Sequence, residues 1–170
     1  AGRILSDLDS RAVAAALEWA AAEGHAVLTL ADGDYPQSLL ETADPPALLY
    51  LHGRRELLAR PGLAVVGSRS ATPQGISNAE QFARTFSRAG LTIVSGLALG
   101  IDAAAHRGGL EGEGSTIAVL GTGADILYPQ RNRALGERIA REGLIVSEFA
   151  LGTPPHGGNF PRRNRVISGL

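Results

Sequence analysis

Apolar runs that are followed by glycine or serine recur along the second part of the chain at nearly even spacing. The four runs end at positions 66, 94, 120 and 146, so successive ends lie 28, 26 and 26 residues apart. This spacing is typical of one strand followed by one helix in a parallel sheet. The pattern therefore predicts an α/β fold, a three-layer sandwich around a mostly parallel central sheet.

Between these runs the apolar residues follow the three-to-four spacing of helices. We expect helices over residues 73–89, 101–110 and 133–141, and a further helix over residues 160–170. In the first of them we expect one apolar stripe to be buried, formed by Ile76, Ala79, Phe82, Ala83 and Phe86.

The first 60 residues follow a less regular pattern, which we interpret as an N-terminal extension of the same domain. Residues 11–23 predict a helix, and residues 26–30 and 47–51 predict strands. We expect the extension to lengthen the sheet and cover one edge, so that residues 1–170 form a single domain with regular strand-helix units over residues 61–170. The chain lacks Met and ends after a predicted helix with no further strand, which indicates a fragment truncated at its C-terminus.

Composition narrows the possible chemistry. With 44% hydrophobic and 19% charged residues, the 170-residue chain is able to bury a core. All 16 basic residues are Arg, which excludes the Lys of a P-loop, and the absence of Cys excludes a thiolate zinc site and a Cys nucleophile. We find no metal-ligand spacing, secretory signal or apolar run long enough to span a membrane. We therefore expect a cytoplasmic protein without metal or cofactor.

Charge is distributed unevenly, although the net charge is only −1. Residues 1–60 contain five Arg and nine acidic residues, hence −4, whereas residues 128–170 contain seven Arg and three acidic residues, hence +4. A polyanion would therefore be bound locally rather than over the whole surface.

The turns that follow the predicted strands contain the candidate site. Ligands of open α/β sheets bind where the strands end, and glycine there lets the backbone approach a phosphate. The candidates in three such turns are Gly67, Ser68, Arg69, Ser95, Gly96, Leu97, Gly121 and Thr122. Arg69 is suited to phosphate through its guanidinium, and the alternative is an exposed Arg after a tight turn. For the turn at Gly96, the alternative is a glycine that only packing requires.

Asp102 and His106 lie four residues apart on one predicted helix. An acid–base pair is one interpretation, and a helix-capping Asp with a hydrogen-bonded His is the other. No Ser or Cys is placed as a nucleophile beside them, so we predict no catalytic residue here.

Two clusters combine an aromatic residue with Arg, one following Tyr128 and one beginning at Phe160. Their candidate binding residues are Arg131, Asn132, Phe160, Arg162, Arg163, Asn164 and Arg165. Aromatic stacking beside Arg is typical of single-stranded nucleic acid binding, whereas a solvated basic face is the simpler explanation. These residues alone do not distinguish a single strand from a nucleotide.

In the order and spacing of its motifs the chain resembles the DNA-processing protein A (DprA/Smf) family over about residues 35–170. The matching motifs are Gly67-Ser68-Arg69, Ser95-Gly96-Leu97-Ala98-Leu99-Gly100-Ile101-Asp102 with Ala105-His106, Tyr128-Pro129, Ser147-Glu148, Phe160-Pro161 and Arg163-Asn164-Arg165. The resemblance implies a Rossmann-like fold and a protein that binds and protects single-stranded DNA and loads the recombinase RecA onto it in natural transformation. It also implies a homodimer and no enzymatic activity.

The resemblance further implies that Arg69 holds a DNA phosphate. The residues that it implies around the same pocket are Ser68, Ser95, Gly96, Gly121, Arg163, Asn164 and Arg165. One departure is Leu99, because some family members have a basic, DNA-contacting residue there.

A nucleotide-binding enzyme of related fold, or a nucleotide sensor, is the alternative function. Nucleotide hydrolases of that type have a Pro-Gly-Gly-x-Gly-Thr-x-x-Glu motif with a catalytic Glu. This chain has Gly121-Thr122-Gly123 without a matching Glu, which argues against hydrolysis.

Overall fold

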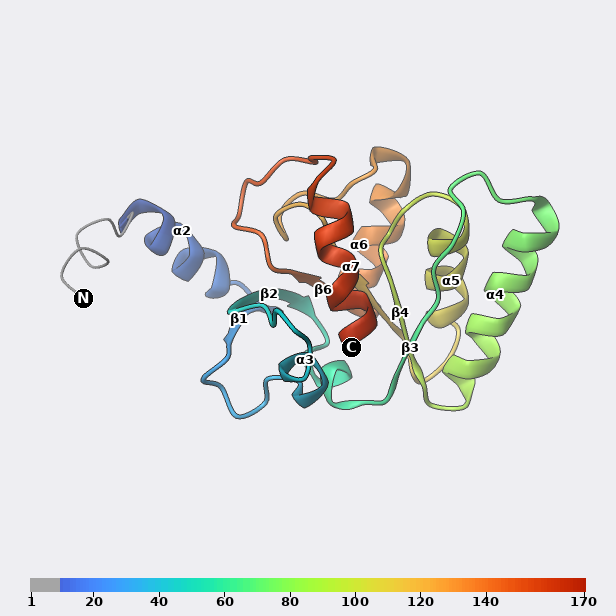
Figure 1. Cartoon of the computed structure of the whole chain (residues 1–170), viewed down its shortest axis with the longest axis horizontal. Coiled ribbons are helices and arrows are strands. Elements are labelled where there is room, and N and C mark those ends of the chain that lie inside the picture. The colour runs from blue at the N-terminus through green and yellow to red at the C-terminus, as the bar shows by residue number, and fades with distance from the viewer. Residues whose placement is uncertain (1–9) are drawn as a thin grey trace.

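The computed structural model describes residues 10–170, which contain a six-stranded sheet with helices on both faces (Figure 1). The strands are β1 (His25–Thr29), β2 (Leu48–Gly53), β3 (Gly62–Ala64), β4 (Thr92–Ser95), β5 (Thr116–Val119) and β6 (Leu144–Ser147), in the order β1-β2-β6-β5-β4-β3. Strands β3 to β6 are parallel, as predicted. Strand β2 pairs antiparallel with β6, and β1 with β2, so the N-terminal extension lengthens the sheet as expected.

All five helices predicted from the sequence are present, and their ends lie within three residues of the predicted bounds. The α-helices are α2 (Ser10–Ala20), α3 (Gln37–Leu40), α4 (Pro73–Arg88), α5 (Ile101–Gly109), α6 (Arg133–Glu142) and α7 (Asn159–Gly169), with short 3-10 helices η1 (Arg55–Ala59) and η2 (Gln130–Asn132). Thr72 caps α4, because its hydroxyl accepts a hydrogen bond from the N–H of Gly75 (3.1 Å). None of the helices within residues 10–170 has the length and apolar character that crossing a bilayer requires.

Successive side chains of each strand point to opposite faces of the sheet, and they form two hydrophobic cores, one on each face. Ile117 and Val119 of β5 pack in one core with Val166 of α7. Ala118, between them in sequence, packs in the other core with Ile139 of α6. Helix α7 thus covers one face, and α4, α5 and α6 cover the other (Figure 1). This arrangement confirms the predicted three-layer sandwich.

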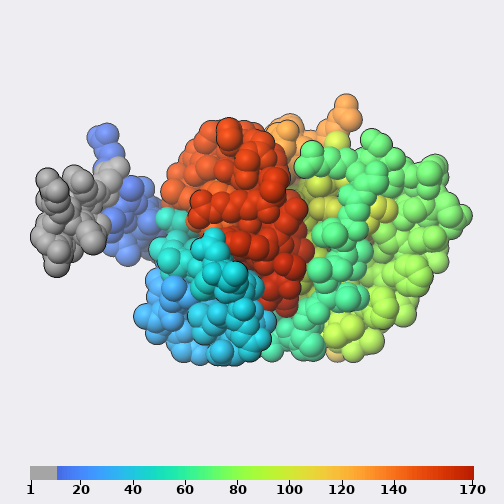
Figure 2. Space-filling model, viewed as in Figure 1, coloured from blue at the N-terminus to red at the C-terminus, as the bar shows by residue number. Residues whose placement is uncertain are grey.

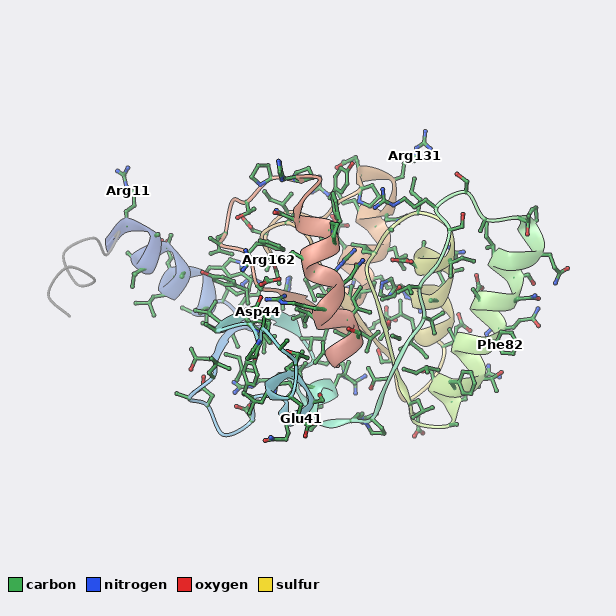
Figure 3. All side chains as sticks on the ribbon, in the orientation of Figure 1. Arg11, Glu41, Asp44, Phe82, Arg131 and Arg162 are labelled. Atoms are coloured by element: carbon green, nitrogen blue, oxygen red, sulfur yellow. The ribbon has the colours of Figure 1, made fainter. Side chains whose placement is uncertain are left out.

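The predicted burial of the α4 stripe is only partly correct. Its two alanines are buried, but Phe82 is 61% exposed and Phe86 is 38% exposed. Helix α4 lies so close to α5 that a Cβ on Gly108 would be 2.1 Å from the carbonyl oxygen of Glu80. Only small side chains fit in that contact, so the phenyl rings face outward, as Phe82 does in Figure 3.

Candidate functional site

The turn after β3 brings Arg69 to the carboxyl edge of the sheet. Gly67 lies against Ile101 at the start of α5, and a Cβ on it would be 2.8 Å from Ile101 Cγ1. The N–H of Ile101 donates to the carbonyl of Ser68 (3.1 Å), whose hydroxyl accepts a hydrogen bond from the amide two residues further on (3.1 Å). Arg69 is exposed, and its Cζ lies 5.7 Å from the centre of the Phe160 ring. The close packing at Gly67 therefore fixes where the guanidinium of Arg69 emerges.

A buried carboxylate connects this turn to the turn after β4. Asp102 is 5% exposed, and it accepts hydrogen bonds from the N–H of Gly67 (3.3 Å) and the N–H of Gly96 (3.1 Å). The hydroxyl of Ser95 adds a bond to the backbone carbonyl that follows β3 (2.7 Å). The cap position of α5 is Gly100, without a side-chain cap, so our interpretation of Asp102 as a helix cap is wrong. Asp102 instead holds two strand ends together.

His106 is buried beneath the same turn and is hydrogen-bonded at both ring nitrogens. Its Nε2 accepts from the N–H of Leu97 (3.1 Å), so its Nδ1 donates to the hydroxyl of Thr116 (2.8 Å), which donates to a β4 carbonyl (2.6 Å). Burial, with a smaller effect of Arg163, lowers the pKa of His106 to about 3. The ring is therefore neutral at neutral pH. Its partners are a backbone amide and a hydroxyl, not Asp102, which removes the acid–base interpretation.

The turn after β4 has an unusual backbone conformation at Leu97, whose φ is 60°. A left-handed conformation costs a residue other than glycine about 1–2 kcal/mol. Asn132 holds the turn, because its Nδ2 donates to the carbonyls of Leu97 (2.8 Å) and Ala98 (3.0 Å). Asn132, which we predicted as a binding residue, thus shapes the site from beneath.

Arg163 reaches from α7 into the floor of the site and is only 4% exposed. Its Nη1 donates to the carbonyls of Gly96 (2.8 Å) and Val119, and its Nη2 forms no hydrogen bond within residues 10–170. Burial lowers the pKa of Arg163, while the charge of Asp102 acts in the opposite direction. A Cβ on Gly96 would be 2.5 Å from Nη2, so a side chain at position 96 would displace this guanidinium.

Aromatic residues form the rim above this floor. Phe160 lies over Gly121, where a Cβ would be 2.7 Å from Phe160 Cδ1, and the amide of Asn159 donates to the Gly121 carbonyl (3.1 Å). The ring of Tyr128 stacks against Phe160 with centroids 5.9 Å apart. Thr122 lies inside, 1% exposed, with its hydroxyl bonded to a carbonyl of the following loop (2.6 Å). The absence of a side chain at Gly121 therefore lets Phe160 pack closely against the backbone, and Thr122 stabilises the loop that follows β5.

These residues border an open groove of about 880 Å³. It follows the line where α7 meets the segment after β3 (Figure 2). Predicted residues that line it are Gly67, Arg69, Phe160, Arg163, Asn164 and Arg165. A groove with cationic and aromatic side chains is typical of sites for a polyanion that also carries aromatic rings, because the cations attract the charges and the aromatic side chains stack on the rings.

Arg165 and Arg162 share an acidic partner beside the groove. Arg165 binds Glu148 through two parallel bonds (2.6 and 2.7 Å) and donates to Asp44 (3.1 Å). Arg162 lies 3.4 Å from the same Glu148 carboxylate, whose side chain is 6% exposed. Hydrogen bonding to Glu148 raises the pKa of Arg165. The protein therefore partly neutralises these two Arg, whereas Arg69 has no ion pair with any of residues 10–170.

The structure thus gathers most of the predicted residues but leaves Arg131 apart, since its exposed side chain points away from the body (Figure 3). Asp102 and Glu148 organise the site although we did not predict them as site residues. Both residues lie in the motifs of the family resemblance. Two features of the sequence could have identified them: Asp102 directly follows a glycine-rich turn, and Glu148 is an acidic residue in a segment rich in Arg. Within the described residues, no three His, Asp or Glu side chains gather to hold a metal ion.

The sequence of the chain is similar to those of known DNA-processing proteins. Residues 26–170 match the sequence model described as DNA recombination-mediator protein A. The chain is 50% identical over 147 residues to Protein Smf from Synechocystis sp., and 44% identical over 142 residues to DNA processing protein DprA from Streptococcus pneumoniae. Each alignment covers 84% of this chain, but 37% and 50% of the two relatives, so the chain spans half of their length or less.

Two solved structures are similar throughout the fold. The X-ray structure of DNA processing protein A from Streptococcus pneumoniae has a TM-score of 0.85 and 38% identity, covering 96% of this chain and 56% of that one. A structure of DNA processing protein A from Helicobacter pylori, which concerns its single-stranded DNA binding mode, has a TM-score of 0.75 and 34% identity, covering 84% and 65%. The predicted Rossmann-like fold is therefore confirmed.

Proposed function

The chain belongs to the DNA recombination-mediator protein A family, and we propose that its groove binds single-stranded DNA through the phosphate backbone. The main support is the pair of Arg69, exposed along the groove, and Arg163, buried in its floor with Nη2 free of protein partners among residues 10–170. Two cations that line one open groove favour an anion, and the Arg guanidinium matches phosphate with two parallel hydrogen bonds.

The aromatic rim favours a nucleic acid over a small anion. Phe160 lies beside Arg69, and Tyr128 stacks on Phe160, so ring surfaces and a cation are adjacent. Stacking of a base on an aromatic side chain contributes about 1–3 kcal/mol. The net charge of −1 disfavours wrapping of a duplex. The Helicobacter pylori relative, with its single-stranded DNA binding mode, supports the same ligand.

We extend the proposal to the longer protein of which such a chain would be part. It would be a recombination mediator of the cytoplasm that protects incoming single strands and loads RecA in natural transformation, as a homodimer and without catalysis. The family description and the names of the relatives support this role. His106 supports a role without catalysis only in that both of its ring nitrogens are hydrogen-bonded within the fold.

The test is a titration of labelled oligo-dT with the chain, followed by fluorescence anisotropy at several salt concentrations. Arg69→Ala should weaken binding about tenfold or more, because a hydrogen bond to a charged group is worth about 1.5–3 kcal/mol. It should also reduce the slope of log K against log salt by about 1, equally for oligo-dT and oligo-dC.

Arg88→Ala is the matched control, since it removes the same charge from an exposed position at the end of α4. Equal loss in both variants would show non-specific attraction and contradict the groove. Competition by AMP would instead favour a nucleotide-binding enzyme or sensor, and competition by duplex DNA would contradict the preference for single strands.

A further inference from the structure

Two histidines lie opposite one another on the antiparallel strands β1 and β2, on the side of the sheet where α6 lies. His25 and His52 are partners in the register, and the N–H of His25 donates to the carbonyl of Ala22 (3.1 Å) instead of to β2. The two residues therefore form a pair of the non-hydrogen-bonded type, in which opposing side chains are closest. Their ring centres are 4.1 Å apart, and the ring planes are inclined by 70°.

The ring of His25 is held from two directions. Its Nδ1 donates to the carbonyl of Trp19 (2.9 Å), and the indole of Trp19 stacks on it with centroids 4.1 Å apart. In a neutral imidazole a proton on Nδ1 leaves the lone pair on Nε2, and this Nε2 forms no hydrogen bond within residues 10–170. An Nδ1–H bonded to a carbonyl is typical of a histidine that binds a metal ion through Nε2.

His52 provides a second imidazole at the same place. The side chain is partly exposed, and neither ring nitrogen forms a hydrogen bond in the described part of the chain. Burial, with a smaller effect of His25, lowers the pKa of His52, so the ring is neutral at neutral pH. Two nitrogens that share one ion lie about 3–4 Å apart, because metal–nitrogen bonds are about 2.0–2.1 Å long. Rings whose centres are 4.1 Å apart are close enough for this approach.

Both rings border an open cavity of about 450 Å³ beside α6, which gives an ion access from solvent. Two carboxylates, of Asp125 and Glu137, line the cavity together with one Arg, Arg141. Because the carboxylates outnumber the guanidinium, the lining favours a cation over an anion. None of the residues that line this cavity also lines the groove.

We propose that His25 and His52 together bind one divalent transition-metal ion of the kind of Cu²⁺ or Zn²⁺, with Nε2 of His25 as one ligand. Imidazole is a preferred ligand of both ions. Water would complete the coordination, since no third His, Asp or Glu among residues 10–170 gathers with this pair. The ion would join β1 to β2 at the edge of the sheet, so the inference is independent of the proposed function.

The test is a titration of the chain, without an affinity tag, with CuCl₂, followed by the fluorescence of Trp19, the single Trp of the sequence. Because Trp19 stacks on His25, bound Cu²⁺ should quench its emission, and quenching should saturate at one equivalent. Zn²⁺ should compete for the same site with lower affinity. His52→Gln should weaken Cu²⁺ binding about tenfold or more, since loss of even an outer partner of a metal ligand costs about 10–100-fold.

His156→Gln is the matched control, because it removes an exposed His that does not line the cavity, and it should bind Cu²⁺ as the parent chain does. Circular dichroism checks that both variants are folded. Electron paramagnetic resonance of Cu²⁺ on the parent chain needs no substitution and should show coupling to two imidazole nitrogens. Equal affinity in the parent chain and His52→Gln, equal weakening in both variants, or coupling to fewer than two nitrogens would overturn the proposal.

Discussion

Replacing Asp102 by alanine removes an acceptor that the turns after β3 and β4 share. The N–H groups of Gly67 and Gly96 would both lose their partner, and Arg163 would lose the negative charge of Asp102, which raises its pKa against the effect of burial. Because Asp102 is 5% exposed, water has little access to replace the carboxylate. The change therefore tests whether this carboxylate holds the two turns together.

The magnitude follows from the two bonds. A hydrogen bond to a charged group contributes about 1.5–3 kcal/mol, and the bond from Gly96 is buried, whereas the bond from Gly67 is longer and only partly buried. If each bond contributes an amount in the lower half of that range, Asp102→Ala lowers the free energy of unfolding by about 3–4.5 kcal/mol. Asp102→Asn keeps one acceptor oxygen but turns an amide donor toward the other N–H, so about half of the loss is expected.

Urea unfolding followed by circular dichroism measures both changes, with the denaturant dependence m as a check on two-state behaviour. Asp125→Ala is the matched control, because the Asp125 carboxylate also accepts a backbone N–H, from Gly152 (3.0 Å), but at an exposed position. We expect about 1 kcal/mol or less for this control. If Asp102→Ala costs no more than Asp125→Ala, the carboxylate does not brace the turns and the argument is refuted.

Two further substitutions test other buried groups. The pKa of His106 is about 3 in the fold and 6.5 as its ordinary value, so stability present above pH 6.5 is lost as pH falls toward 3. Between pH 6.5 and 4.5 this loss is about 2–3 kcal/mol, and urea unfolding at both pH values should show it in the parent chain but not in His106→Gln. An equal pH effect in the two proteins would contradict the assignment. Glu148→Gln should cost about 2 kcal/mol, because it breaks a largely buried pair with the partly exposed Arg165. In thermal unfolding Glu137→Gln, which alters an exposed pair with Arg133, should cost under about 1 kcal/mol, and equal costs would argue against an anchoring role of Glu148.

The parallel part of the fold was predictable because it depends on local spacing. An apolar run, a small residue and a helix of suitable length recur, and parallel strands require such crossovers. The pairing of β2 with β6 was not predictable in the same way, since an apolar strand pattern does not specify its neighbour. Nor does helical spacing reveal that contact with Gly108 leaves Phe82 and Phe86 on the surface.

The site was predictable in place but not in detail. Glycine turns at strand ends located Gly67, Gly96 and Gly121 correctly at one edge of the sheet, because parallel strands end on the same side. The burial of Arg163 was not apparent, since a charged residue at a helix start is normally exposed. Its position depends on the missing side chain of Gly96, a contact between residues 67 positions apart that no local pattern reports.

The hydrogen bonds of Arg163 also make the site dependent on the docking of α7 against the sheet. Its Nη1 bonds join α7 to carbonyls at Gly96 and Val119, which lie 67 and 44 positions earlier. A chain in which the sheet has formed but α7 has not docked therefore has no groove floor. A ligand that binds the guanidinium stabilises only the docked state. Ligand binding in the groove and docking of α7 are thus coupled equilibria. A bound ligand shifts the population toward the docked helix, and the docked helix provides the floor of the site that the ligand occupies.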